Sequence, residues 1–182
     1  MLEKYALITA IHIITDSPNT SFSVRGLAAK TGLSPGAART SLDYMKEKGI
    51  VSLKIAGNTY QYKANLESAL CRHWKILFNL DKLADSKITN EITQKIPNVQ
   101  SVLLYGSWSR GTNDEKSDID LLVITNASVK TDLGFINKLK KEANVSIFSF
   151  SDWKKKAFTD KVFYENVIYD SIVLFGERPV VL

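Results

Sequence analysis

The segment from residue 102 to residue 123 constrains the fold more than any other part of the chain. An apolar run, Val102–Tyr105, ends at Gly106-Ser107, and a second apolar run then opens with Asp118 and Asp120. Side chains two residues apart on a strand point to the same face, so the two carboxylates project together. Carboxylates this close repel each other unless a positive charge lies between them. The pattern predicts two strands joined by a short turn, with an acidic pair suited to a cation.

The residue types around this turn favour phosphate chemistry. Carboxylate oxygens together with substrate phosphates are ligands that suit Mg²⁺, and paired metal ions stabilise the attacking and leaving oxygens of nucleotidyl transfer. Gly106 permits close backbone approach. Ser107 begins a short helical turn whose N–H groups and hydroxyl would face a triphosphate, and Arg110 would add positive charge.

The runs GSWSRG (106–111) and SDIDLLV (117–123) resemble the signature of the DNA polymerase β-like nucleotidyltransferase superfamily, in particular its minimal archaeal and bacterial members. The likeness extends over about residues 88–176. It implies an NTP substrate, Mg²⁺ or Mn²⁺, and transfer of a nucleoside monophosphate to a hydroxyl of an unknown acceptor. It also implies that Asp118 and Asp120 are the catalytic metal ligands, and that Gly106, Ser107 and Arg110 bind the nucleotide.

The third carboxylate that such enzymes usually carry on a later strand is not found. The equivalent strand is predicted over residues 144–150, and alternation places Asn144 and Ser146 on the face expected for the acid. Ser146 is predicted to take the acid position. Two hypotheses therefore stay open: an active nucleotidyltransferase, or a catalytically weak or inactive, nucleotide-sensing, DNA-binding transcriptional regulator.

The first 65 residues have a different pattern. Apolar spacing predicts helices over 2–15, 23–31 and 35–48, with Ser34 as N-cap and Pro35 in the first turn. Two alternating strands, 50–55 and 59–63, follow around Gly57-Asn58.

This order resembles a winged helix-turn-helix domain, in which a β-hairpin wing follows the recognition helix. The resemblance places Arg39, Thr40 and Lys46 toward the major groove or its phosphates, and Lys54 on the wing. Residues 1–65 hold eight basic and four acidic side chains, whereas residues 66–182 hold 16 and 15. Double-stranded DNA is the expected partner, although a packing or dimerisation module with a solvated basic face is the alternative.

The whole chain is predicted to be α+β. A winged helix (1–65) leads through a connecting helix (66–96) to a nucleotidyltransferase-fold α/β domain with a small mixed sheet (97–182). Further strands are expected over 118–125, 145–150 and 172–175, and helices over 131–143 and 152–169. The lack of a long apolar run excludes a membrane span, and the single cysteine fits the cytoplasm. A homodimer is compatible with the winged-helix resemblance.

Overall fold

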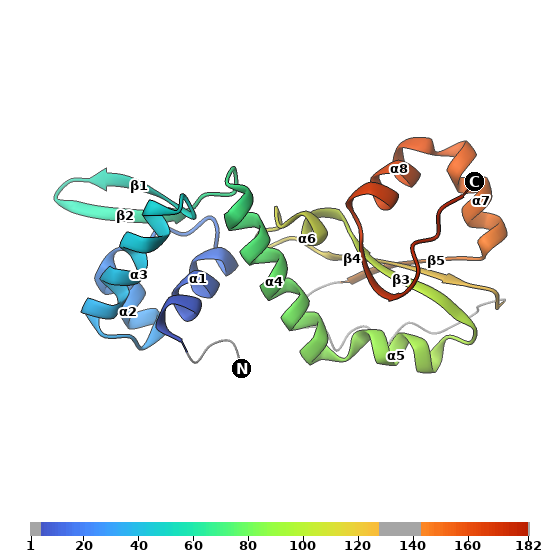
Figure 1. The fold of residues 1–182 in the computed structure, drawn as a ribbon, viewed down its shortest axis with the longest axis horizontal. Helices are drawn as coiled ribbons and strands as arrows, with labels where there is room; N and C mark the ends of the chain where they lie inside the picture. The colour runs from blue at the N-terminus through green and yellow to red at the C-terminus, as the bar shows by residue number, and fades with distance from the viewer. Residues whose placement is uncertain (1–4, 128–142, 182) are drawn as a thin grey trace. The chain divides into compact units, whose positions relative to one another are not determined.

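The computed structural model describes residues 5–127 and 143–181 (Figure 1). These residues form two compact units, Met1–Phe78 with Gly111–Lys116, and Asn79–Arg110 with Ser117–Leu182. The chain therefore leaves the second unit between the Gly-Ser turn and the acidic pair, and returns to it. In the described parts of the chain, none of the helices has the length and apolar character that a membrane crossing needs.

From residue 5 to residue 64, the first unit is described as three helices followed by a β-hairpin, in the order expected from the sequence. They are α1 (Ala6–Asp16), α2 (Val24–Thr31), α3 (Pro35–Glu47), β1 (Val51–Ala56) and β2 (Thr59–Ala64). Ser34 caps α3 by accepting a hydrogen bond from the Ala37 backbone N–H, and Pro35 occupies the first turn. Gly32 ends α2 in the left-handed conformation. The apolar stripes of the helices meet in one core that includes Leu27, Leu42 and Met45.

The helix predicted over residues 66–96 is two helices, so the prediction of one connecting helix was wrong. α4 (Ala69–Ser86) ends where Lys87 takes a positive φ of 56°, and α5 (Ile88–Lys95) follows directly. The Ser86 hydroxyl accepts a hydrogen bond from the Ile88 N–H. The break lets α5 turn its buried residues, Ile88 and Ile92, toward the sheet of the second unit.

The second unit is built on a four-stranded sheet in the order β5-β4-β3-β6. Its strands are β3 (Val99–Tyr105), β4 (Ile119–Thr125), β5 (Ala143–Phe148) and β6 (Ile172–Gly176). β3 pairs antiparallel with both β4 and β6, whereas β4 and β5 are parallel. The prediction of a small mixed sheet is thereby confirmed.

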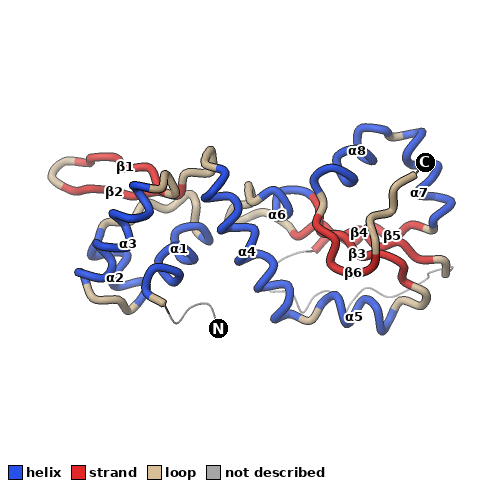
Figure 2. The backbone as a smooth tube through the Cα atoms, viewed as in Figure 1, coloured by secondary structure: helices blue, strands red, loops and turns tan. Residues whose placement is uncertain are grey.

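Helices cover both faces of this sheet (Figure 2), which explains why most positions of its central strands are apolar. Leu104 and Leu121 face the core that α5 closes, and Leu103 and Leu122 face the core built around Trp153. Trp153 belongs to α7 (Phe150–Thr159), which precedes α8 (Lys161–Asp170).

The helical stretch predicted over residues 152–169 therefore also contains a break. Ser149 caps α7, and the Asp160 carboxylate caps α8 by accepting from the Phe163 N–H. Most of the helix expected over residues 131–143 lies outside the described residues, and Ala143 begins β5.

Candidate active site

The acidic pair lies where β4 begins. Asp118 directly precedes the strand, and Asp120 is its second residue. Asp120 is level with Tyr105, the last residue of β3, and with Asn144 near the start of β5. Both aspartates are partly exposed, while Ile119 between them is buried. Side chains alternate along a strand, so the two carboxylates point to one face and Ile119 packs on the other.

Asn144 brings an amide to both carboxylates. Its Nδ2 lies 3.4 Å from Asp118 Oδ2 and 3.2 Å from Asp120 Oδ1. The prediction that Ser146 takes the position of the third acid was wrong, because Ser146 pairs with Leu122, two residues further along the parallel ladder than the Asp120–Asn144 pair. The strand face was predicted correctly. The register was not, because alternation along one strand does not show which of its residues lies level with Asp120, 24 residues before Asn144.

The turn after β3 lies against Asp120. Gly106 begins the short helix α6 (Gly106–Arg110) with a φ of +76°. A Cβ atom on Gly106 would lie 2.3 Å from Asp120 Oδ2. Glycine is therefore required twice, for the left-handed backbone and for the space beside the carboxylate. The Gly106 turn and the Asp120 carboxylate therefore lie side by side.

Buried groups hold this turn in place. Trp108 is 3% exposed, and its Nε1 donates to the Ser117 carbonyl at 3.4 Å, next to Asp118. Asn79 of α4 donates from Nδ2 to the Trp108 carbonyl at 3.0 Å. Trp108 is thus a packing residue that ties α6 to the segment before the acidic pair. No sequence pattern pointed to Asn79, because it lies 29 residues before its partner, in another helix.

Ser107 and Arg110 occupy the same short helix. Ser107 is partly exposed, and Arg110 is exposed, with Nη1 3.5 Å from Asp170 Oδ2 of α8. Arg110 therefore leans toward α8, where its guanidinium meets the Asp170 carboxylate. An ion pair this exposed contributes little stability.

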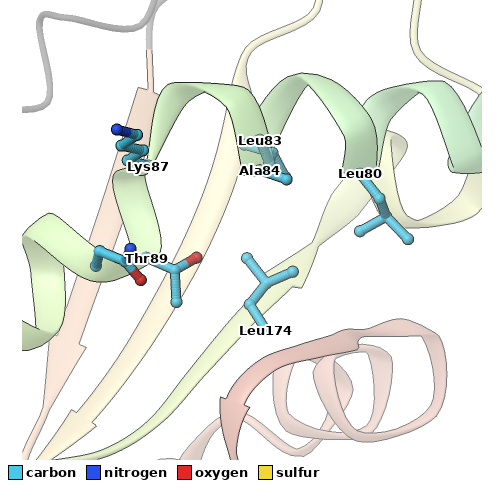
Figure 3. Close-up of a pocket in the computed structure, with 7 residues that line it drawn as sticks. Leu80, Leu83, Ala84, Lys87, Thr89 and Leu174 are labelled. Atoms are coloured by element: carbon cyan, nitrogen blue, oxygen red, sulfur yellow. The ribbon is translucent and has the colours of Figure 1, made fainter. Parts of the chain in front are cut away.

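No group of three His, Cys, Asp or Glu side chains suited to a metal occurs within residues 5–127 and 143–181. The chemistry of the site is accordingly that of two carboxylates and one amide. A separate cavity of about 380 Å³ lies where α4 and α5 meet β6 (Figure 3). Its lining includes Leu80, Leu83, Lys87 and Leu174, and none of the side chains of the acidic site.

The four residues expected to contact DNA all lie on exposed positions of the first unit: Arg39, Thr40, Lys46 and Lys54. Arg39 Nε lies 3.0 and 3.2 Å from the two carboxylate oxygens of Asp43, one turn along α3. That hydrogen bond raises the pKa of the Arg39 guanidinium. The Thr40 hydroxyl donates to the Gly36 carbonyl at 3.1 Å.

Three solved structures resemble parts of the chain. A toxin–antitoxin complex with AMP-PNP has a TM-score of 0.39 and 22% identity, over 52% of this chain and 74% of that one. A DNA-binding protein from Sulfolobus solfataricus has a TM-score of 0.35 and 12% identity, over 50% of this chain and 96% of its own. An archaeal chromatin protein has a TM-score of 0.32 and 13% identity, over 87% and 67%. TM-scores this low do not establish a shared fold.

The comparison of sequence families is more informative. No curated protein matches the chain. The family model described as "Polymerase beta, Nucleotidyltransferase" matches residues 86–179, just over half of the chain. The matched region contains the mixed sheet, the Gly106 turn and the acidic pair. The chain therefore belongs to the polymerase beta nucleotidyltransferase family.

Proposed function

We propose that the second unit binds an NTP with a divalent cation and transfers its nucleoside monophosphate to a hydroxyl group. The observation that carries the proposal is the placement of Asp118 and Asp120 beside the glycine turn, within the region that matches the nucleotidyltransferase family. Fold alone does not establish activity, so the proposal depends on this site.

The donor atoms fit Mg²⁺ or Mn²⁺. Asp118 and Asp120 present carboxylate oxygens on one face, and Asn144 brings an amide that has a carbonyl oxygen of its own. Oxygen ligands of this kind, completed by phosphate oxygens, are what Mg²⁺ takes in nucleotide sites. When bound there, the cation would neutralise the phosphates and polarise the reacting phosphoryl group.

The chain's own residues would position the nucleotide. The backbone at Gly106 leaves room for a phosphate, the Ser107 hydroxyl would donate to it, and Arg110 would exchange Asp170 for a phosphate oxygen. In the transfer, the acceptor oxygen bonds to the α-phosphorus, and the bond to the α,β-bridging oxygen breaks. Pyrophosphate leaves with that electron pair, and the hydroxyl proton passes to solvent or to the acceptor's own base.

Labelled NTPs test this function. Each of the four is incubated with the full chain and Mg²⁺, and both binding and pyrophosphate release are measured, first with water as acceptor and then with candidate acceptors. Asp118→Ala and Asp120→Ala are expected to lower release at least about 10³-fold. Asp85→Ala, at an exposed position of α4, is the matched control and should leave it unchanged. Absence of NTP binding, or release that survives both substitutions, contradicts the proposal.

Nucleotide sensing is the second candidate function, and Asn144 favours it, since this neutral amide contacts both aspartates. The result that distinguishes it is saturable, cation-dependent NTP binding without pyrophosphate release. The nucleotide would then act as a signal rather than as a substrate, and the output would be a change in the first unit's affinity for DNA.

We also propose that the first unit is a winged helix that binds double-stranded DNA. The order of three helices and a hairpin supports this, as do the net charge of residues 1–65 and the exposure of Arg39, Lys46 and Lys54. Arg39 would read a guanine edge only after leaving Asp43. Selection from random duplexes, repeated with Arg39→Ala, tests the proposal. No salt-sensitive binding to any duplex would contradict it.

A further inference from the structure

The sequence pattern placed Asn144 on the face of the acidic site but did not predict its contact with both aspartates. Its amide lies within hydrogen-bonding distance of both carboxylates, at 3.4 and 3.2 Å, and its backbone is level with Asp120 in the parallel ladder. We infer that Asn144 positions the two aspartates and limits the site, so that cation binding is weak and nucleotidyl transfer is slow. This inference rests on the proposed function.

Without a cation, the acidic site consists of two carboxylates and one amide. Asp118 and Asp120 repel each other when both are ionised. An amide that donates a hydrogen bond to each carboxylate reduces that repulsion without adding a charge. Asn144 can therefore hold the two side chains in a site-like arrangement before any cation arrives, which a third carboxylate in its place could not do.

The charge of the ligand set affects the affinity of the site for a cation. Two carboxylates and a neutral amide carry two negative charges, whereas three carboxylates would carry three. The number of charged ligands is one of the properties that set the affinity of an oxygen site for a divalent cation. With Asn144, the site depends on the phosphates of the nucleotide to complete both the charge and the ligand set.

Nucleotidyl transfer also removes a proton from the acceptor. The attacking hydroxyl must lose a proton as its oxygen bonds to phosphorus and pyrophosphate departs. An amide has no basic atom that would accept this proton near neutral pH. A carboxylate at residue 144 would accept it and release it to solvent after pyrophosphate leaves. A positioned base of this kind contributes about 10²–10⁴-fold to a rate.

Asn144→Asp tests the inference with almost no change of shape, and Ser146→Asp is the matched control. Ser146 lies on the same strand face, but it is level with Leu122 rather than with Asp120. Mn²⁺ affinity is measured without nucleotide, from the electron paramagnetic resonance signal of the free ion. Asn144→Asp is expected to bind Mn²⁺ about tenfold more tightly than the wild type. Ser146→Asp is expected to leave the affinity unchanged.

Thermal unfolding gives a second readout that does not depend on activity. In EDTA, Asn144→Asp should melt below the wild type, because three carboxylates repel one another. Excess Mn²⁺ should raise its melting temperature more than that of the wild type. If both proteins melt alike with and without Mn²⁺, Asn144 does not hold the acidic pair and the inference is wrong.

Pyrophosphate release from each NTP, with water as acceptor, completes the test. Asn144→Asp is expected to release pyrophosphate about 100-fold faster than the wild type. If the wild type binds NTP, an Asn144→Asp variant that binds Mn²⁺ no better than Ser146→Asp, or that releases pyrophosphate no faster than the wild type, overturns the inference. Conversely, tighter Mn²⁺ binding by Asn144→Asp, in a protein that binds no NTP, contradicts the proposed function and supports the role of Asn144.

Discussion

The α3 helix of the first unit and the acidic site of the second unit place their charged side chains in opposite ways. On α3 of the first unit, Arg39 pairs with Asp43. At the C-terminal end of the same helix, Lys48 pairs with Glu47 at 2.8 Å. In the second unit, two side chains of like charge lie side by side, and the group that meets both is an uncharged amide. Opposite charges that satisfy each other on a surface require no ligand. Like charges kept together against their repulsion indicate a binding site, although the net charge of the second unit is close to zero.

Trp153→Ala should have the largest effect on stability, and it should destabilise the second unit without destabilising the first. Trp153 is fully buried, packs on Phe148, Phe163 and Tyr164, and donates from Nε1 to the Pro179 carbonyl at 2.7 Å. The truncation is expected to cost about 3–5 kcal/mol in the second unit. Hydrogen exchange of peptides from residues 5–64 should change little. Equal loss of protection in both units would show that they do not have independent cores.

A pair of glycine substitutions compares the backbones of the two units. Gly106 and Gly32 have nearly the same φ, +76° and +73°, but a Cβ atom meets Asp120 Oδ2 at 2.3 Å in the first case and nothing within 4 Å in the second. Gly32→Ala should cost about 1 kcal/mol of unfolding free energy. Gly106→Ala should cost more and should also weaken Mn²⁺ binding, because the Asp120 carboxylate must move. If both variants keep wild-type Mn²⁺ affinity, the glycine turn is not part of the site.

Asp43→Ala sharpens the account of the first unit. It removes the carboxylate that engages Arg39 on the exposed face of α3. If that face contacts DNA, the affinity for a duplex should rise by a few-fold. The slope of log affinity against log salt concentration should become steeper by about the amount that one additional phosphate contact gives. The control is Glu67→Ala, which removes an exposed carboxylate outside α3. Equal effects of both substitutions would mean that only net charge matters and that α3 has no special role.

The smallest effect expected is a pH dependence at the start of α8. The Lys156 ammonium, followed by the Phe163 backbone N–H, holds the pKa of Asp160 below its ordinary value. A carboxylate with a lowered pKa in the folded state stabilises the protein above its unfolded pKa. This contribution disappears as the pH falls through the lowered folded value. As the pH is lowered from about 5 to about 2, the melting temperature of Asp160→Asn should therefore fall less steeply than that of the wild type. Parallel melting curves for the two proteins would contradict this role.

Local chemistry made much of the fold predictable. The Ser34 cap, the Gly57-Asn58 turn and the apolar run of β4 are properties of short segments, and the structure has all three. The face that carries the acidic pair also follows from period-two alternation.

Contacts between distant segments could not be predicted in the same way. Sequence alternation assigned Ser146 to the site, but the parallel pairing of β4 with β5 brought Asn144 there. The break at Lys87 has no proline or glycine to mark it, and the contact from Asn79 to Trp108 joins helices that no pattern connects. In each case, the determining interaction is tertiary packing rather than the propensity of a segment.

The most direct test of the acidic pair as a nucleotide site is calorimetric titration of each NTP, with Mg²⁺ present, into the full chain. Asp118→Asn/Asp120→Asn removes both charges and keeps the shapes of the side chains. We expect saturable binding of at least one NTP to the wild type, and binding at least about 100-fold weaker to the double variant. Equal affinity for the two proteins, or no binding of any NTP to the wild type, would contradict the account.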